Sequence, residues 1–143
     1  MTTTLLDSKT RVIVRELYDA YERRDFETVA KFIHDDIDWI IYGPITVFPF
    51  AGARRGRAAV IQVLTDIAAV YRLESYKPEI VIIEGERAAV VSDVSFRQRS
   101  SDRVLRFRVA NFMLLKNGQL IEFREFTNSF DVVEQALGHE LKL

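Results

Sequence analysis

Apolar residues recur every three to four positions in the first half of the chain, the spacing that places them on one face of an α-helix. We predict a helix over residues 9–24, after a capping signal at Asp7 and Ser8. A short second helix opens at Asp25, and a third helix follows Gly56. The apolar stripes of these helices comprise Ile13, Val14, Leu17, Ala20, Tyr21, Val29, Phe32, Ile33, Val60, Val63, Leu64 and Ile67.

One predicted strand and one long loop separate the second helix from the third. Residues 35–42 are predicted as a strand that ends at Gly43 and Pro44. Residues 43–56 contain three of the six glycines and two of the three prolines, so we predict a loop over this stretch. A loop of this length often covers a pocket.

From Lys77 onward the apolar pattern has a period of two, which is typical of strands. Short turns are predicted at Gly85-Glu86, at Ser101-Asp102 and at Asn117-Gly118. The resulting strands cover residues 78–84, 87–99, 103–115 and 119–127, and a closing helix covers residues 128–138. Strands joined by such turns form an antiparallel meander.

This order of elements predicts a single α+β domain over residues 1–143, with three N-terminal helices packed on one face of a curved antiparallel sheet. The hydrophobic content of 48% is sufficient for one continuous core. No shift in composition divides the chain into two parts.

Composition narrows the classes of function. A net charge of −1 creates no field that favours nucleic acid or an anionic membrane. The absence of cysteine, with only two histidines, argues against disulfides and against a metal site. Neither a leader-like segment nor a stretch of roughly twenty apolar residues occurs. We therefore expect a cytoplasmic protein without a metal or a cofactor.

The period-two pattern also assigns side chains to the two faces of the sheet. Odd positions between residues 103 and 115 are apolar except for Asn111, and this face is predicted to face the core. A strict two-residue turn at Asn117-Gly118 would place Glu122 and Arg124 inward. A glycine bulge there would instead bring Glu125 beside Asn111, with Phe123 inside. We prefer the bulge, because it keeps Phe123 in the core.

The opposite face of the sheet combines arginines with an apolar group. We interpret four arginines on this face as a solvated rim that pairs with acids such as Asp93 and Glu122, namely Arg97, Arg99, Arg106 and Arg108. A phosphate or nucleic-acid role is the alternative. The apolar group comprises Ala89, Val91, Ala110, Phe112 and Leu114, and it predicts a partner subunit on this face.

Several segments resemble the nuclear-transport-factor-2-like superfamily, within it the SnoaL-like and ketosteroid-isomerase-related proteins. They are AYERRDFETVAKFIHDDIDW, FAGARRGRAAV, NFMLLKNGQLIEFREF and the closing ALG. The resemblance implies a cone, in which a strongly curved sheet wraps around helices and encloses an apolar pocket, and a homodimer formed through the sheet. Members include isomerases, cyclases, epoxide hydrolases, dehydratases and binding domains without catalysis.

Residue by residue, the resemblance to ketosteroid isomerases is incomplete. Their aspartate base would fall near Ile41, and their helix tyrosine would fall at Leu17, with Tyr21 one turn further on. Their protonated strand aspartate would fall at Asn111. These departures argue against true steroid isomerase activity and leave Glu125 as the remaining acid.

We predict that Glu125 and Asn111 are catalytic. Burial would raise the pKa of Glu125 into the range of a usable proton shuttle, and Asn111 would donate its amide hydrogens to an oxyanion. The predicted ligand is a small hydrophobic carbonyl compound, and the reaction is of the isomerase or cyclase type. The predicted ligand-binding wall consists of Tyr21, Trp39, Ile41, Phe48, Phe50, Phe107, Val109 and Phe123.

Two alternatives to catalysis remain open. Glu125 could be a structural residue held by Tyr21, Asn111 or a cation such as Arg57. The whole domain could also be a non-catalytic module that binds a ligand or a protein, which the missing acid at Ile41 favours.

Overall fold

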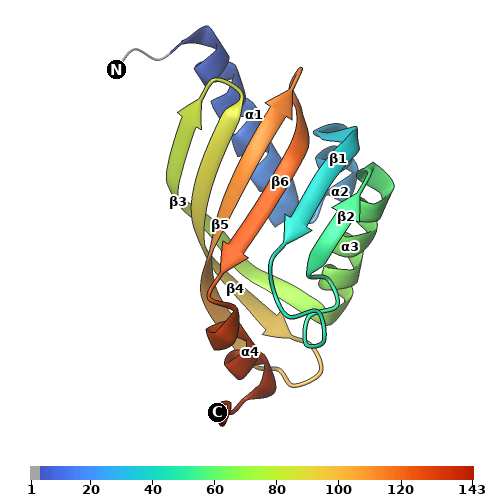
Figure 1. Cartoon of the computed structure of the whole chain (residues 1–143), viewed down its shortest axis with the longest axis vertical. Coiled ribbons are helices and arrows are strands. Elements are labelled where there is room, and N and C mark those ends of the chain that lie inside the picture. The colour runs from blue at the N-terminus through green and yellow to red at the C-terminus, as the bar shows by residue number, and fades with distance from the viewer. Residues whose placement is uncertain (1–3) are drawn as a thin grey trace.

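A computed structural model describes residues 4–143 and confirms the α+β fold (Figure 1). The helices are α1 (Leu5–Glu22), α2 (Phe26–Lys31), α3 (Arg57–Val70) and α4 (Ser129–Leu137). The strands are β1 (Ile33–Ile41), β2 (Gly52–Arg55), β3 (Tyr71–Glu84), β4 (Arg87–Gln98), β5 (Val104–Lys116) and β6 (Gln119–Thr127). Within the described residues, no helix is long and apolar enough to cross a membrane.

The six strands form one curved, open sheet in the order β2-β1-β6-β5-β4-β3. The prediction of a wholly antiparallel sheet is wrong in one place, because β1 and β6 pair in parallel. The reason is topological: α3 carries the chain to the far edge of the sheet, and the meander then returns strand by strand until β6 lies beside β1. Helices α1, α2 and α3 lie together against one face of this sheet (Figure 1).

Local signals explain most helix boundaries. Helix α1 begins earlier than predicted, because Thr4 and Asp7 form a reciprocal capping box that satisfies two free backbone N–H groups. Asp25 caps α2 as predicted, through its hydrogen bond from the Thr28 N–H. Helix α2 ends at Lys31, and Ile33 is the first residue of β1 instead of a helix residue.

Two strand predictions need correction. The loop predicted over residues 43–56 contains the short edge strand β2, which pairs with the end of β1. Strand β3 begins at Tyr71 rather than Pro78, and Pro78 lies in its middle. Proline is tolerated there because β3 is an edge strand and its register shifts beside Pro78.

The β5–β6 hairpin contains the predicted bulge, but at a different residue. Asn117 and Gly118 form a strict two-residue turn, with φ angles of 50° and 78°. The register then shifts at Ile121, so that Phe123 lies opposite Met113 and Glu125 lies opposite Asn111. The preferred register is therefore confirmed, and Arg124 faces outward.

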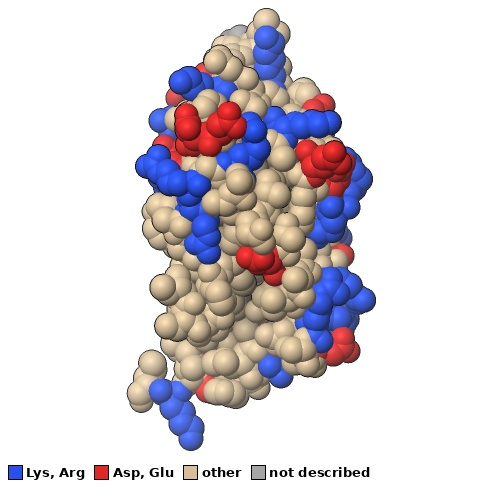
Figure 2. All heavy atoms as spheres, turned by 90° about the vertical axis from the view of Figure 1, so that its right-hand side faces the viewer, with Lys and Arg blue, Asp and Glu red and all other residues tan. Residues whose placement is uncertain are grey.

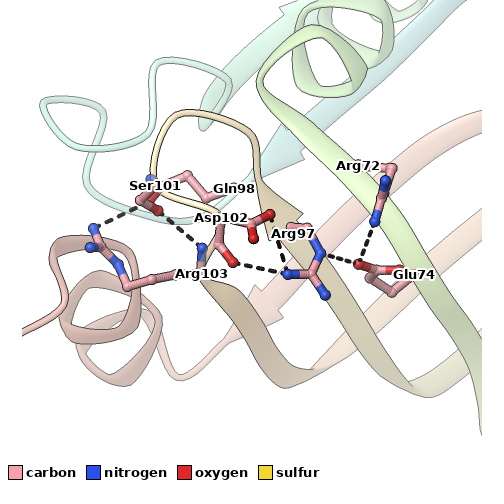
Figure 3. Close-up of polar contacts among 7 residues, drawn as sticks. All are labelled: Arg72, Glu74, Arg97, Gln98, Ser101, Asp102 and Arg103. Carbon is pink, nitrogen blue, oxygen red and sulfur yellow. Dashed lines mark hydrogen bonds and ion pairs between the residues drawn. The ribbon is translucent and has the colours of Figure 1, made fainter.

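The β4–β5 connection is longer than the two-residue turn we predicted. The Gln98 N–H donates to the Arg103 carbonyl, so four residues form the turn. Its conformation is held by the Ser101 hydroxyl on Gln98 Oε1 (2.6 Å) and by the Arg97 guanidinium on the Asp102 carbonyl (Figure 3). The longer turn shifts the pairing of β4 with β5 by two residues. Because side chains alternate with a period of two, each residue still points to the face that we predicted.

Ion pairs cover much of the outer sheet face. Arg106 pairs with Asp93 at 2.9 Å, and Arg108 pairs with Glu79 at 2.7 Å. Figure 3 shows a third group on the same face, in which Glu74 lies between Arg72 and Arg97. The rim interpretation is confirmed for Arg97, Arg106 and Arg108, whereas Arg99 donates to the Ala68 carbonyl. Glu122 pairs with none of these arginines among the described residues.

Candidate active site

A cavity lies between the inner face of the sheet and the helices. All ten residues predicted for the site line it: Tyr21, Trp39, Ile41, Phe48, Phe50, Phe107, Val109, Asn111, Phe123 and Glu125. Its volume is about 140 Å³, close to that of a dry protein cavity able to hold one aromatic ring. Most of its wall is aliphatic or aromatic, which favours a largely apolar occupant.

The long loop after β1 forms one end of the cavity. Phe48 and Phe50 from this loop contact each other, with ring centroids 5.3 Å apart, and Phe50 also packs edge-on against Tyr71. Residues at the β6–α4 junction, Thr127 and Ser129, line the same cavity. Figure 2 shows uncharged surface over the lower middle of the β2–α3 side, where this loop lies, whereas charged side chains gather above it and along one edge.

Glu125 is the one acidic side chain on the cavity wall among the described residues. It lies on β6 between its strand neighbours Asn111 and Ile41. Its Oε1 accepts a hydrogen bond of 2.9 Å from Asn111 Nδ2, and no ion pair to it occurs within residues 4–143. Burial raises the pKa of Glu125 to about 7, an effect that the Asn111 hydrogen bond partly opposes. The carboxyl group can therefore take up or release a proton near neutral pH.

Two tyrosines determine how Asn111 is oriented. The Tyr18 hydroxyl donates to Asn111 Oδ1 at 2.6 Å, and the Tyr76 hydroxyl lies 3.3 Å from the same oxygen. Because both hydroxyls donate hydrogen bonds to the amide oxygen of Asn111, its amide nitrogen is directed toward Glu125. Burial raises the pKa of both tyrosines above its ordinary value, so they remain neutral donors. This network fixes the position of the carboxyl group.

The cation proposed as a structural partner of Glu125 lies elsewhere. Arg57 donates to the Ile33 carbonyl at 2.8 Å and pairs with Asp35 at 2.7 Å. The interpretation of Glu125 as an ion-paired structural residue through Arg57 is therefore wrong. Asn111 does hold Glu125, as the structural alternative also expected.

Trp39 contributes a flat surface and a free donor. Its indole stacks on the Phe123 ring at a centroid distance of 3.9 Å and an interplanar angle of 16°. Its Nε1–H is buried and has no acceptor within residues 4–143. Buried donors without partners are uncommon, which makes this N–H available to an oxygen of a ligand.

Three side chains of this region could not be assigned to the site from the sequence. In the sequence, Tyr18 is indistinguishable from a residue that only packs in the core. Its helical spacing from Val14 and Tyr21 nevertheless shows that the three share one face of α1. Tyr76 lies outside every predicted strand. Arg24, whose guanidinium is buried against Tyr21, carries no sequence signal at all.

A metal site requires at least three His, Cys, Asp or Glu side chains that lie close together. The part of the chain that the structure describes contains no such group.

Residues 14–123 match the family model of the SnoaL-like domain. The chain belongs to the SnoaL-like family. Comparison with curated proteins finds no significant match.

Solved structures with the same fold include proteins of several descriptions. A proposed isomerase from Rhodopseudomonas palustris is 41% identical and has a TM-score of 0.80, and the match covers 88% of this chain and 93% of that one. An NTF2-like protein from Burkholderia xenovorans is 24% identical, with a TM-score of 0.79 and coverage of 94% and 99%. A proposed polyketide cyclase from Xanthomonas campestris is 18% identical, with a TM-score of 0.78 and coverage of 92% and 98%. The last two similarities concern the fold alone.

Proposed function

We propose that this SnoaL-like protein is a cofactor-independent enzyme that moves a proton next to the carbonyl group of a small, mostly apolar compound. The observation that carries the proposal is the Glu125 carboxyl group, which has a pKa of about 7, lines the cavity and is positioned by Asn111. A base with a pKa near the working pH can both remove and return a proton.

In the proposed reaction, the Glu125 carboxylate takes a proton from the carbon beside the carbonyl group. The electrons of the broken C–H bond move onto the carbonyl oxygen and form an enolate. Asn111 Nδ2 has a second hydrogen besides the one given to Glu125, and this hydrogen stabilises the enolate oxygen. Where a C=C bond adjoins the deprotonated carbon, return of the proton from Glu125 to the far carbon of that C=C bond moves the double bond and completes an isomerisation. Alternatively, attack of the enolate carbon on a second carbonyl group of the same molecule closes a ring, and the proton on Glu125 then passes to the alkoxide oxygen that this attack creates.

The position of Glu125 compensates for the missing acid of the ketosteroid isomerases. Ile41, where the resemblance would place their base, pairs with Glu125 across the β1–β6 ladder. The carboxyl group of Glu125 thus serves the same end of the cavity from the neighbouring strand. Similarity to a proposed isomerase at 41% identity supports this class of reaction.

Hydrogen exchange into a simple ketone tests the proposal without knowledge of the natural substrate. We expect the protein to accelerate deuterium incorporation at the carbons flanking the carbonyl group of 2-indanone in D₂O, followed by proton NMR. Glu125→Gln should abolish this acceleration while the protein remains folded. Equal exchange with both proteins would contradict the proposal.

A non-catalytic ligand-binding domain is the second candidate, and the apolar Ile41 at the expected base position favours it. Such a domain would bind ketones in the cavity without accelerating exchange. Glu125→Gln would then change affinity, and wild-type protein would exchange 2-indanone no faster than buffer does.

We also propose that two copies pair through the outer sheet face. Phe112, Phe126 and Tyr42 are about half exposed there, and Phe126 stacks on Tyr42 with ring centroids 4.6 Å apart. Contiguous exposed aromatic surface of this kind favours a protein partner. Sedimentation velocity should give a dimer for wild-type protein and a monomer for Phe112→Arg, and a wild-type monomer at micromolar concentration would refute the pairing.

A further inference from the structure

Arg24 is a buried charge that the proposed proton transfer does not use. Its guanidinium carbon lies 4.6 Å from the ring centroid of Tyr21, 5.6 Å from that of Phe26 and 5.9 Å from that of Phe96. Both terminal nitrogens, Nη1 and Nη2, are buried and have no hydrogen-bond acceptor within residues 4–143. The preceding Arg23, by contrast, is exposed and lies 3.8 Å from the Asp25 carboxylate.

Aromatic contacts alone satisfy this cation incompletely. A cation over a ring face gains on the order of 1 kcal/mol, whereas an uncompensated buried charge costs several times more. A lysine could escape that cost by losing its proton, but a guanidinium stays charged at every physiological pH. Arg24 therefore lacks the planar, doubly accepting partner for which its two terminal nitrogens are arranged.

The backbone at Arg24 is also unusual. Its φ of 60° lies in the left-handed region, which favours glycine or asparagine and costs a side chain such as arginine about 1 kcal/mol or more. This residue separates α1 from α2, where a glycine would make the same turn without strain. The strain indicates that the side chain itself has a use at this position.

The guanidinium lies directly behind the cavity wall. Two of the three rings that surround it, Tyr21 and Phe96, line the cavity. Tyr21 is affected by both charged groups: burial chiefly raises its pKa, the charge of Arg24 and a polar contact of the Tyr21 hydroxyl with the Arg24 side chain lower it, and the Glu125 carboxyl group raises it. The Glu125 carboxyl group thus lines the cavity directly, whereas the Arg24 guanidinium is separated from it by the rings of Tyr21 and Phe96.

We propose that Arg24 binds a carboxylate group of the compound that enters the cavity. The substrate is then a small, apolar keto acid, with its carboxylate at the Tyr21–Phe96 wall and its reactive carbonyl group near Glu125. The choice of a keto acid rests on the proposed function, whereas anion binding by Arg24 does not. Two parallel N–H···O hydrogen bonds from Nη1 and Nη2 would satisfy both orphaned nitrogens. Entry requires the ring of Tyr21 or Phe96 to turn aside, because protein atoms cover both nitrogens.

Two probes of equal shape test this site. Benzoate carries a carboxylate, acetophenone carries a neutral carbonyl group, and one aromatic ring suits the cavity. Trp39 is the single tryptophan of the chain and lines the cavity, so its indole N–H signal in a ¹⁵N–¹H spectrum reports binding of either probe. At pH 6, below the pKa of about 7 of Glu125, this carboxyl group repels benzoate little. We expect wild-type protein to bind benzoate about tenfold more tightly than acetophenone.

Variants of Arg24 and Arg23 distinguish the loss of an anion-binding site from a general loss of packing. Arg24→Gln should remove the preference for benzoate and leave the acetophenone affinity within about twofold of wild type. Arg24→Lys replaces the two-nitrogen fork by a single ammonium group that can lose its proton when buried, so it should retain only part of the preference. Arg23→Gln removes the same charge from the exposed neighbouring position and should leave the preference unchanged.

Equal binding of the two probes by wild-type protein would overturn the proposal. So would a preference that survives in Arg24→Gln, or a loss of affinity in that variant that is the same for both probes. Should Arg24→Gln fail to fold, the wild-type preference and its reduction in Arg24→Lys decide the question. The preference should persist in Glu125→Gln, so a failure of the proposed catalysis and a failure of the anion site are distinguished.

Discussion

The two faces of the sheet shift the pKa of carboxyl groups in opposite directions. On the outer face, the Arg106 guanidinium beside Asp93 lowers the pKa of Asp93, and Arg97 lowers that of Glu74. On the inner face, burial raises the pKa of Glu125 to about 7. Strand alternation, together with the register shift at Ile121, places these acids on opposite faces of the sheet. An acid with a cation beside it stays ionised, whereas a buried acid without one can change its protonation state near neutral pH.

Glu125→Gln should have the largest effect on activity. General acid–base catalysis contributes roughly a hundredfold to ten-thousandfold, so we expect a loss of that size in the rate of deuterium exchange into 2-indanone. In wild-type protein this rate should rise as the pH passes through about 7 and then level off, because the base must be ionised. A rate that does not depend on pH between 5 and 9 would contradict the role of Glu125.

The same variant should remove a pH dependence of stability. The pKa of Glu125 rises from 4.5 in the unfolded chain to about 7 in the folded protein. The folded state therefore binds the proton more tightly, and stability falls as the pH rises through this interval, by roughly 3 kcal/mol in total. Urea denaturation should show this loss in wild-type protein and its absence in Glu125→Gln. Asp93→Asn should have the opposite effect on the pH dependence of stability. It should remove a contribution that increases as the pH rises, because the pKa of Asp93 is lowered on folding.

Tyr18→Phe should have a moderate effect. It removes the hydrogen bond of 2.6 Å to Asn111 Oδ1, which we expect to cost about 1 kcal/mol of stability. Activity should fall several-fold as well, because the Asn111 amide is held less firmly toward Glu125. Tyr76→Phe is the matched control, and its longer contact of 3.3 Å predicts a smaller change in both measurements.

Arg106→Gln on the outer face should have the smallest effect. The Arg106 side chain is largely exposed, so its ion pair with Asp93 contributes little to stability and is screened by salt. Exchange of 2-indanone should be unchanged. A loss of activity here would show that the outer face contributes to the reaction, which the comparison of the two faces excludes.

Periodicity in the sequence is sufficient to predict the residues of the inner face. Alternation along β5 and β6, with one extra residue in the hairpin, brings Asn111, Phe123 and Glu125 to the same side of the sheet. Periodicity does not locate the bulge, because a shift at Gly118 and a shift at Ile121 give the same facing of Glu125.

Features that depend on tertiary packing are not predictable in this way. Strand β2 forms only because the end of β1 offers it a partner, and Tyr76 reaches the cavity through the long edge strand β3. Arg24 follows the first helix in a charged segment that has the composition of exposed surface. Two of the rings around its guanidinium, Tyr21 and Phe26, are neighbours in sequence, but the third, Phe96, comes from β4, and no local pattern brings it to Arg24.

The extra residue at Ile121 affects how relatives of this protein must be aligned. In a homologue whose hairpin lacks the bulge, regular pairing from the same Asn-Gly turn would place the residue aligned with Arg124 opposite Asn111. An alignment without a gap would then equate an inward residue of one protein with an outward residue of the other. The presence of the acid in such a homologue should be judged after one gap is placed between the turn and the strand end.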